Sequence, residues 1–88
     1  IEIEEIESAA DKIGYYRNIV IFINKALVLY IESETEIDHN KVQLGLRKIL
    51  PKYYFQIDVK KVNEIPTTKN GKKDRKKMAN IYLSEFGL

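Results

Sequence analysis

The sequence contains no cysteine, no tryptophan and a single histidine among its 88 residues. Without a thiol, the chain can form no disulfide and has no thiolate nucleophile. One imidazole, His39, cannot by itself supply a structural zinc cluster or a His-based triad. His39 follows Asp38, which is positioned to cap a helix, so we expect this side chain to face solvent. The sequence therefore predicts no metal site.

Long hydrophobic runs are also missing. No apolar stretch approaches the roughly 20 residues that a membrane-spanning helix requires, and no basic and then apolar signal segment opens the chain. These absences predict a cytoplasmic protein that does not bind a membrane. The chain starts at Ile1, inside a helical pattern without a lead-in, so we expect a fragment of a larger protein. Its length allows one modest core, which predicts a single domain over residues 1–88.

Charge is unevenly distributed, although the net charge is only +2. Residues 1–36 contain eight acidic and three basic side chains, whereas residues 60–77 contain eight basic and two acidic ones. Such asymmetry indicates a partner with negative charge: a phosphate ester, a nucleic acid or an acidic protein surface. The alternative is that the basic run forms one solvated helix face, which is the commoner use of such a pattern.

Apolar spacing predicts a first helix over residues 3–13, ended by Gly14. Two aliphatic runs, 19–23 and 26–31, fit a β-hairpin closed by a tight turn. Both runs are almost continuously apolar, which indicates a sheet covered by helices on at least part of both faces. Four acidic residues alternate with isoleucines in the first turns, where they suit the helix dipole better than a metal site: Glu2, Glu4, Glu5 and Glu7.

The second half of the chain continues this pattern. Asp38 is expected to cap a helix that closes at Pro51, and alternation from Phe55 predicts a third strand that runs to about Ile65. Asp74 is positioned as the N-cap of a final helix with apolar residues Met78, Ile81, Tyr82 and Phe86. The order of elements predicts an α+β fold, in which a small three-stranded sheet packs with about three helices.

The loop before the final helix is the candidate site of chemistry. A lysine directly after Asn70-Gly71 follows a turn that accepts positive φ, so the Lys72 ammonium can project from its tip. The alternative is a common exposed turn without a specific role. A phosphate-binding loop of the nucleoside-triphosphatase kind is excluded, because no glycine precedes Gly71 at the required spacing and Lys73 follows where Ser or Thr is needed.

Three separated segments match one protein family in the correct order. They are Ile65-Pro66-Thr67-Thr68-Lys69-Asn70-Gly71-Lys72-Lys73-Asp74-Arg75, the opening Ile1-Glu2-Ile3-Glu4-Glu5-Ile6-Glu7, and Leu50-Pro51-Lys52-Tyr53-Tyr54. They resemble the closing, opening and middle motifs of the C-terminal subdomain of adenylate-forming (AMP-binding) enzymes. The Asn-Gly-Lys-x-Asp-Arg form is most similar to nonribosomal peptide synthetase adenylation domains and D-alanine carrier-protein ligases. Gln56 stands where the family usually has a second proline.

This resemblance implies the lid of an ATP-dependent ligase, which activates an amino acid or another carboxylate as acyl-AMP and passes it to a carrier-protein phosphopantetheine thiol. It implies that Lys72 is catalytic in the first step. The positioning residues would be Pro66, Thr68, Asn70, Gly71, Asp74 and Arg75, and Lys73, Lys76 and Lys77 would contact the carrier protein. ATP and Mg²⁺ would be bound mainly by an N-terminal core domain, so the 88 residues alone would be inactive.

A competing hypothesis is a small basic module without catalysis. It would use Lys60, Lys61 and the cluster at residues 69–77 to bind nucleic acid or another protein. Its affinity for nucleic acid would fall steeply with rising salt. The resemblance favours the ligase, with no nucleic-acid partner.

Overall fold

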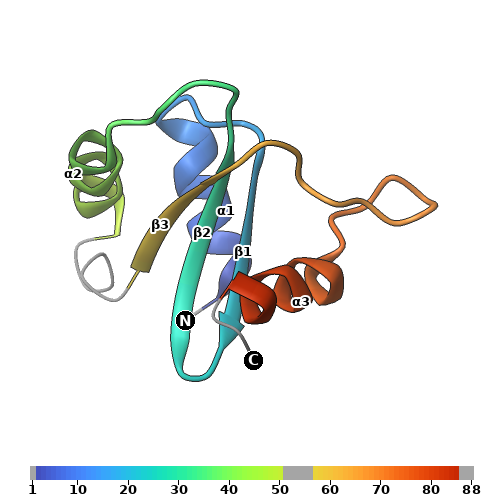
Figure 1. The fold of residues 1–88 in the computed structure, drawn as a ribbon. Coiled ribbons are helices and arrows are strands. Elements are labelled where there is room, and N and C mark those ends of the chain that lie inside the picture. Colours follow the sequence, from blue (N-terminus) through green and yellow to red (C-terminus); the bar gives the residue numbers. More distant parts are fainter. Residues whose placement is uncertain (1, 51–56, 86–88) are drawn as a thin grey trace.

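The computed structural model describes residues 2–50 and 57–85. Their α+β fold consists of six elements in the predicted order: α1 (Ile3–Lys12), β1 (Asn18–Ile23), β2 (Ala26–Glu32), α2 (His39–Ile49), β3 (Ile57–Val62) and α3 (Arg75–Glu85). Figure 1 shows α1 and α2 on one face of the sheet and α3 on the other. The fold class predicted from the sequence is therefore confirmed.

The sheet has the strand order β1-β2-β3. β1 and β2 are antiparallel, and their two-residue turn has φ values of 51° at Asn24 and 65° at Lys25. Two positive φ values are typical of the hairpin turn whose twist matches that of the strands. β3 pairs parallel to β2, because the chain returns through α2 before it enters the sheet again.

The core consists of two layers, because successive residues of a strand face opposite sides of the sheet. The layer under α1 and α2 includes Ile6, Val20, Leu29 and Leu46, and the layer under α3 includes Ile19, Tyr30 and Met78. This explains why β1 and β2 are almost continuously apolar. The Tyr30 hydroxyl is buried without a hydrogen-bond partner among the described residues, and burial raises the pKa of Tyr30 well above its ordinary value.

Several element ends differ from the sequence expectation. β3 ends at Val62 rather than near Ile65, because its partner strand ends at Glu32 and offers no further ladder position. The backbone N–H of Ile65 instead donates to the Glu32 carboxylate at 2.8 Å. α2 ends at Ile49, and the predicted positions of Pro51, Phe55 and Phe86 lie outside the described residues.

Candidate functional site

Residues 67–73 form a small hairpin that projects from the body of the fold (Figure 1, orange). Thr67 and Lys73 pair as an antiparallel bridge at its base. Nearer the tip, the Thr68 N–H donates to the Lys72 carbonyl at 2.7 Å, and the Gly71 N–H donates to the Thr68 carbonyl at 2.9 Å. Gly71 has a φ of 81°, which a residue with a Cβ rarely adopts. The turn that the Asn-Gly pair predicted is therefore present.

Lys72 is held through its backbone while its side chain extends into solvent. Its N–H donates to the Thr68 hydroxyl at 3.2 Å, and its carbonyl accepts from the Thr68 N–H. Within residues 2–50 and 57–85, no hydrogen bond or ion pair engages the Lys72 ammonium. The hairpin thus presents a positive charge on a backbone that is fixed by local hydrogen bonds.

The hairpin leads directly into α3. The Asp74 N–H donates to the Pro66 carbonyl at 3.0 Å, which closes the base of the hairpin. The Asp74 carboxylate accepts from the Lys77 N–H at 3.0 Å and caps the helix, as the sequence predicted. Pro66 and Asp74 therefore connect the hairpin to the first turn of α3.

A buried carboxylate on α1 receives the side chains that follow Lys72. Glu7 is only 7% exposed. The two terminal nitrogens of Arg75 donate to its two oxygens at 2.8 and 3.0 Å, and the Val20 N–H donates to the same group at 2.9 Å. The Lys73 ammonium lies 3.5 Å from Glu7 Oε1. This is a bidentate ion pair with two further donors.

The role expected for Glu7 as one of several acidic residues at a helix start is wrong. Only Glu4 and Glu5 lie in the first turn of α1, and both are exposed. Glu7 instead shares the buried face with Ile3, Ile6 and Ala10. Those positions recur at helical spacing, so the sequence pattern could have predicted that Glu7 is a charged residue on the buried, otherwise apolar face of the helix.

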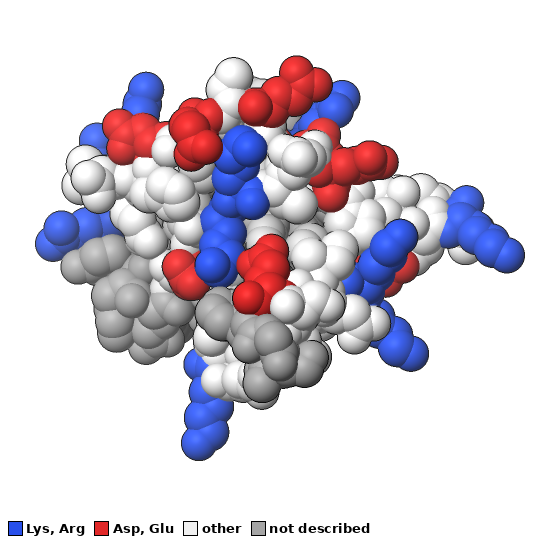
Figure 2. Space-filling model, in the orientation of Figure 1, with Lys and Arg blue, Asp and Glu red and all other residues white. Residues whose placement is uncertain are grey.

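The basic side chains of the cluster at residues 69–77 do not all face solvent. Lys73 and Arg75 are turned toward Glu7, whereas Lys76 and Lys77 are exposed on α3. The Lys73 ammonium is also 3.4 Å from the side-chain oxygen of Asn18, which is fully buried. The Lys73 side chain is 35% exposed and paired with Glu7, so its expected contact with a carrier protein stays a prediction. Figure 2 shows further basic side chains at the projecting hairpin, and acidic and basic residues interspersed elsewhere on that face.

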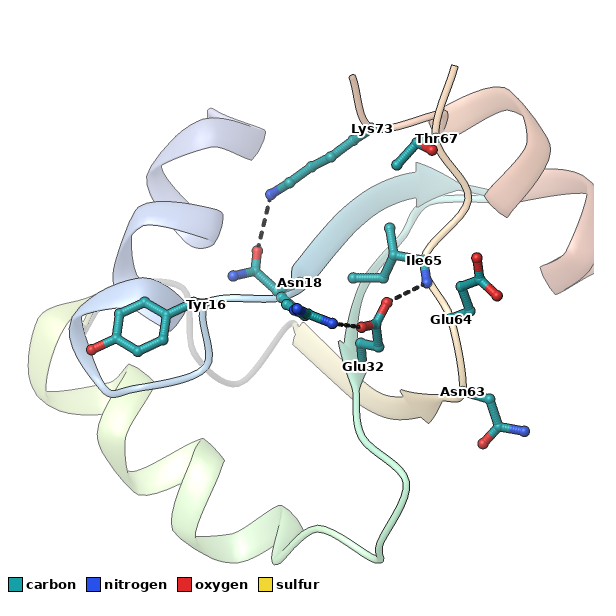
Figure 3. Close-up of a pocket in the computed structure, with 9 residues that line it drawn as sticks. Tyr16, Asn18, Glu32, Asn63, Glu64, Ile65, Thr67 and Lys73 are labelled. Carbon is teal, nitrogen blue, oxygen red and sulfur yellow. Dashed lines mark hydrogen bonds and ion pairs between the residues drawn. The ribbon is translucent and has the colours of Figure 1, made fainter. Parts of the chain in front are cut away.

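An open groove of about 560 Å³ lies beside the base of the hairpin (Figure 3). Thr67 and Lys73 form part of its wall, together with Glu32 at the end of β2 and Tyr16 in the loop between α1 and β1. The Glu32 carboxylate accepts from the Ile65 N–H at 2.8 Å and from Arg17 at 2.9 Å. The backbone hydrogen bond from Ile65 and then the Arg17 interaction lower the pKa of Glu32 below its ordinary value. The groove is thus lined by charges of both signs.

We expect acid to weaken the Glu32 contacts. Folding lowers the pKa of Glu32, so the ionised carboxylate adds to the free energy of unfolding. This contribution is fully present above the ordinary pKa of 4.5 and is lost as the pH falls through the lowered pKa of the folded state. Urea unfolding of wild type and Glu32→Gln should therefore show a stability difference at pH 7 that shrinks below pH 4.5. Exposed Glu34→Gln is the matched control. A difference that is independent of pH would contradict the prediction.

The described residues contain neither a group of metal ligands nor a helix that could span a membrane. Within residues 2–50 and 57–85, no three His, Asp or Glu side chains are grouped so that they could hold an ion. The helices of that part are too short and too polar to cross a bilayer.

Comparisons with known proteins find that this chain is similar to short segments of two synthetases. Zwittermicin A synthase ZmaJ of Bacillus cereus is 35% identical over 60 residues, which cover 68% of this chain and 11% of that protein. Nonribosomal peptide synthetase sidC of Arthroderma benhamiae is 31% identical over 90 residues, which cover all of this chain and 2% of that protein. The chain thus spans only a small part of each relative. No family profile matches it.

A solved structure shares the fold. The crystal structure of IdnL7 superposes with a TM-score of 0.76 over 98% of this chain and 17% of that chain, at 19% sequence identity. At this identity, the likeness concerns the fold alone.

Proposed function

Because the chain is homologous to part of nonribosomal peptide synthetases and has the α+β fold of the C-terminal subdomain of adenylate-forming enzymes, we propose that it is the lid of such a ligase. The complete enzyme activates an amino acid or another carboxylate with ATP. It then transfers the acyl group to the phosphopantetheine thiol of a carrier protein. The observation that carries this proposal is the exposed Lys72 ammonium on a hydrogen-bonded, projecting hairpin.

Lys72 acts in the adenylation half-reaction. In that step, a carboxylate oxygen attacks the α-phosphorus of ATP, and pyrophosphate leaves. The ammonium of Lys72 contacts the carboxylate and the α-phosphate or ribose oxygens, which aligns the nucleophile and offsets the developing negative charge. A compact charge on a flexible stem suits such a contact. Pro66, Thr68, Asn70, Gly71 and Asp74 form or close the hairpin and so set the position of Lys72.

ATP and Mg²⁺ are assigned mainly to an N-terminal core domain, which is a partner in this proposal. The described residues contain no cluster of carboxylates suited to Mg²⁺. The groove beside the hairpin is open, and its acidic residues Glu32 and Glu64 offset the basic residues Arg17 and Lys73. The chain therefore fits a single cationic contact to the nucleotide rather than a complete binding site.

The direct test is to replace Lys72 in a synthetase that contains this segment and to measure the two half-reactions separately. Loss confined to adenylate formation supports the proposal. Equal loss in both half-reactions contradicts it.

The proposal also assigns the exposed lysines of α3 to the carrier protein. Lys77→Glu is expected to slow thiol transfer severalfold, most clearly at low salt, and to leave adenylate formation within about twofold, since rim charges mainly change association rates. An acidic residue in the first turn of α3 also favours the helix, so unfolding would not explain the loss. Lys48→Glu, an exposed position on α2, is the matched control. If both variants slow transfer equally, α3 is not the docking surface.

A further inference from the structure

The geometry points to Glu7 as a positioning residue for Lys72. We propose that its buried carboxylate orients the hairpin by holding Lys73 and Arg75, the residues that follow Lys72 at the junction with α3. This inference rests on the proposed function, because it names the group through which the body of the lid controls the catalytic ammonium.

The first argument is the number of donors that converge on one carboxylate. Glu7 lies on α1, and it accepts from Val20 on β1 and from both terminal nitrogens of Arg75 on α3. Lys73 reaches the same carboxylate from the returning strand of the hairpin. A carboxylate with this many charged and backbone donors is held in one orientation. Glu7 therefore ties the hairpin junction to both α1 and β1.

The second argument is the alternation of side chains along an extended segment. Lys73 faces Glu7 while its neighbour Lys72 is exposed, as expected where adjacent residues at a β-bridge point to opposite sides. Thr67 and Lys73 are paired in such a bridge. A slip of one residue would turn Lys72 toward Glu7 and Lys73 toward solvent. The contacts of Glu7 with Lys73 and Arg75 oppose that slip.

The third argument is that the hairpin has few other attachments. Residues 67–72 are exposed, so the orientation of the projection depends on its two ends. At the entering end, Ile65 is buried and bonded to Glu32. At the leaving end, the contacts to Glu7 supply the corresponding anchor. Loss of either anchor is therefore expected to change the direction in which the tip points, while the hydrogen bonds within the hairpin are largely kept.

The test uses Glu7→Gln in a synthetase that contains this segment. Glutamine keeps an acceptor for the Val20 N–H but removes the charge that holds Arg75 and Lys73. We expect adenylate formation to fall on the order of ten- to a hundredfold, as a displacement of about 1 Å can cause, and thiol transfer from supplied adenylate to stay within about twofold. The matched control is Glu5→Gln, the same change at an exposed position of α1, with both rates unchanged.

The decisive readout is the same substitution in a Lys72→Ala background. If Glu7 acts through Lys72, adding Glu7→Gln to Lys72→Ala causes no further loss of adenylation. A full additional loss overturns the positioning role, as does an unchanged adenylation rate in the single variant. If Lys72→Ala itself has no effect on adenylation, the proposed function fails, and this outcome is distinct from failure of the positioning role alone.

If Glu7→Gln does not fold, Lys73→Met provides the same test. It removes one donor and leaves the bidentate contact of Arg75 with Glu7 in place. We expect a severalfold loss of adenylation that disappears in the Lys72→Ala background. No loss, or a loss that persists in that background, overturns the inference.

Discussion

Replacing Lys72 with alanine in a synthetase that contains this segment is expected to slow adenylate formation about a hundred- to a thousandfold. The loss corresponds to about 3 to 4 kcal/mol of transition-state stabilisation, which is typical when one preorganised electrostatic contact is removed. No folding defect should accompany it, because the side chain is exposed and its hydrogen bonds in the hairpin come from the backbone.

The measurement is the exchange of labelled pyrophosphate into ATP for the first half-reaction, and single-turnover transfer from supplied acyl-adenylate for the second. Transfer should stay within about twofold, since Lys72 is assigned to the chemistry at the α-phosphorus only. Lys69→Ala is a matched control, because it removes an exposed lysine from the same hairpin. A comparable defect in that variant would show that positive charge in general, rather than Lys72, is needed.

The second large effect is expected from Arg75→Met, which leaves the Glu7 carboxylate without its bidentate partner. Removing one member of a buried ion pair costs about 3 to 5 kcal/mol, because the remaining charge stays desolvated. The Arg75 side chain is 34% exposed and Lys73 remains nearby, so we expect a smaller loss of about 2 to 3 kcal/mol. Urea unfolding of the chain at pH 7 measures this loss.

A double variant separates two causes of the stability loss in Arg75→Met: the unpaired buried charge of Glu7 and the lost packing of the Arg75 side chain. Adding Glu7→Gln to Arg75→Met removes the uncompensated charge, so the double variant should be more stable than Arg75→Met alone. Lys76→Met, the same kind of change at the exposed neighbouring position, should stay within about 0.5 kcal/mol of wild type. An Arg75→Met variant as stable as wild type would mean that the ion pair contributes nothing to folding.

Local sequence patterns determined much of the fold. The apolar periodicities located the six elements found in the described part of the chain. The Asn24-Lys25 turn takes the conformation expected of a tight hairpin, and Asp38 and Asp74 cap their helices. These features depend on residues within a few positions of one another. The same holds for the turn that exposes Lys72, since Thr68 and Gly71 bond within it.

The use of the charges near Lys72 depends on contacts between distant parts of the chain. Arg75 and Glu7 are 68 positions apart in the chain, and Lys73 and Asn18 are 55 apart. The local sequence does not distinguish one residue of this basic run from another. In the folded chain, with α1 and α3 on opposite faces of one sheet, Lys73 and Arg75 contact Glu7, whereas Lys76 and Lys77 are exposed to solvent. The sequence alone pointed to Lys72 as the candidate residue, whereas the contacts that anchor its hairpin exist only once the chain has folded.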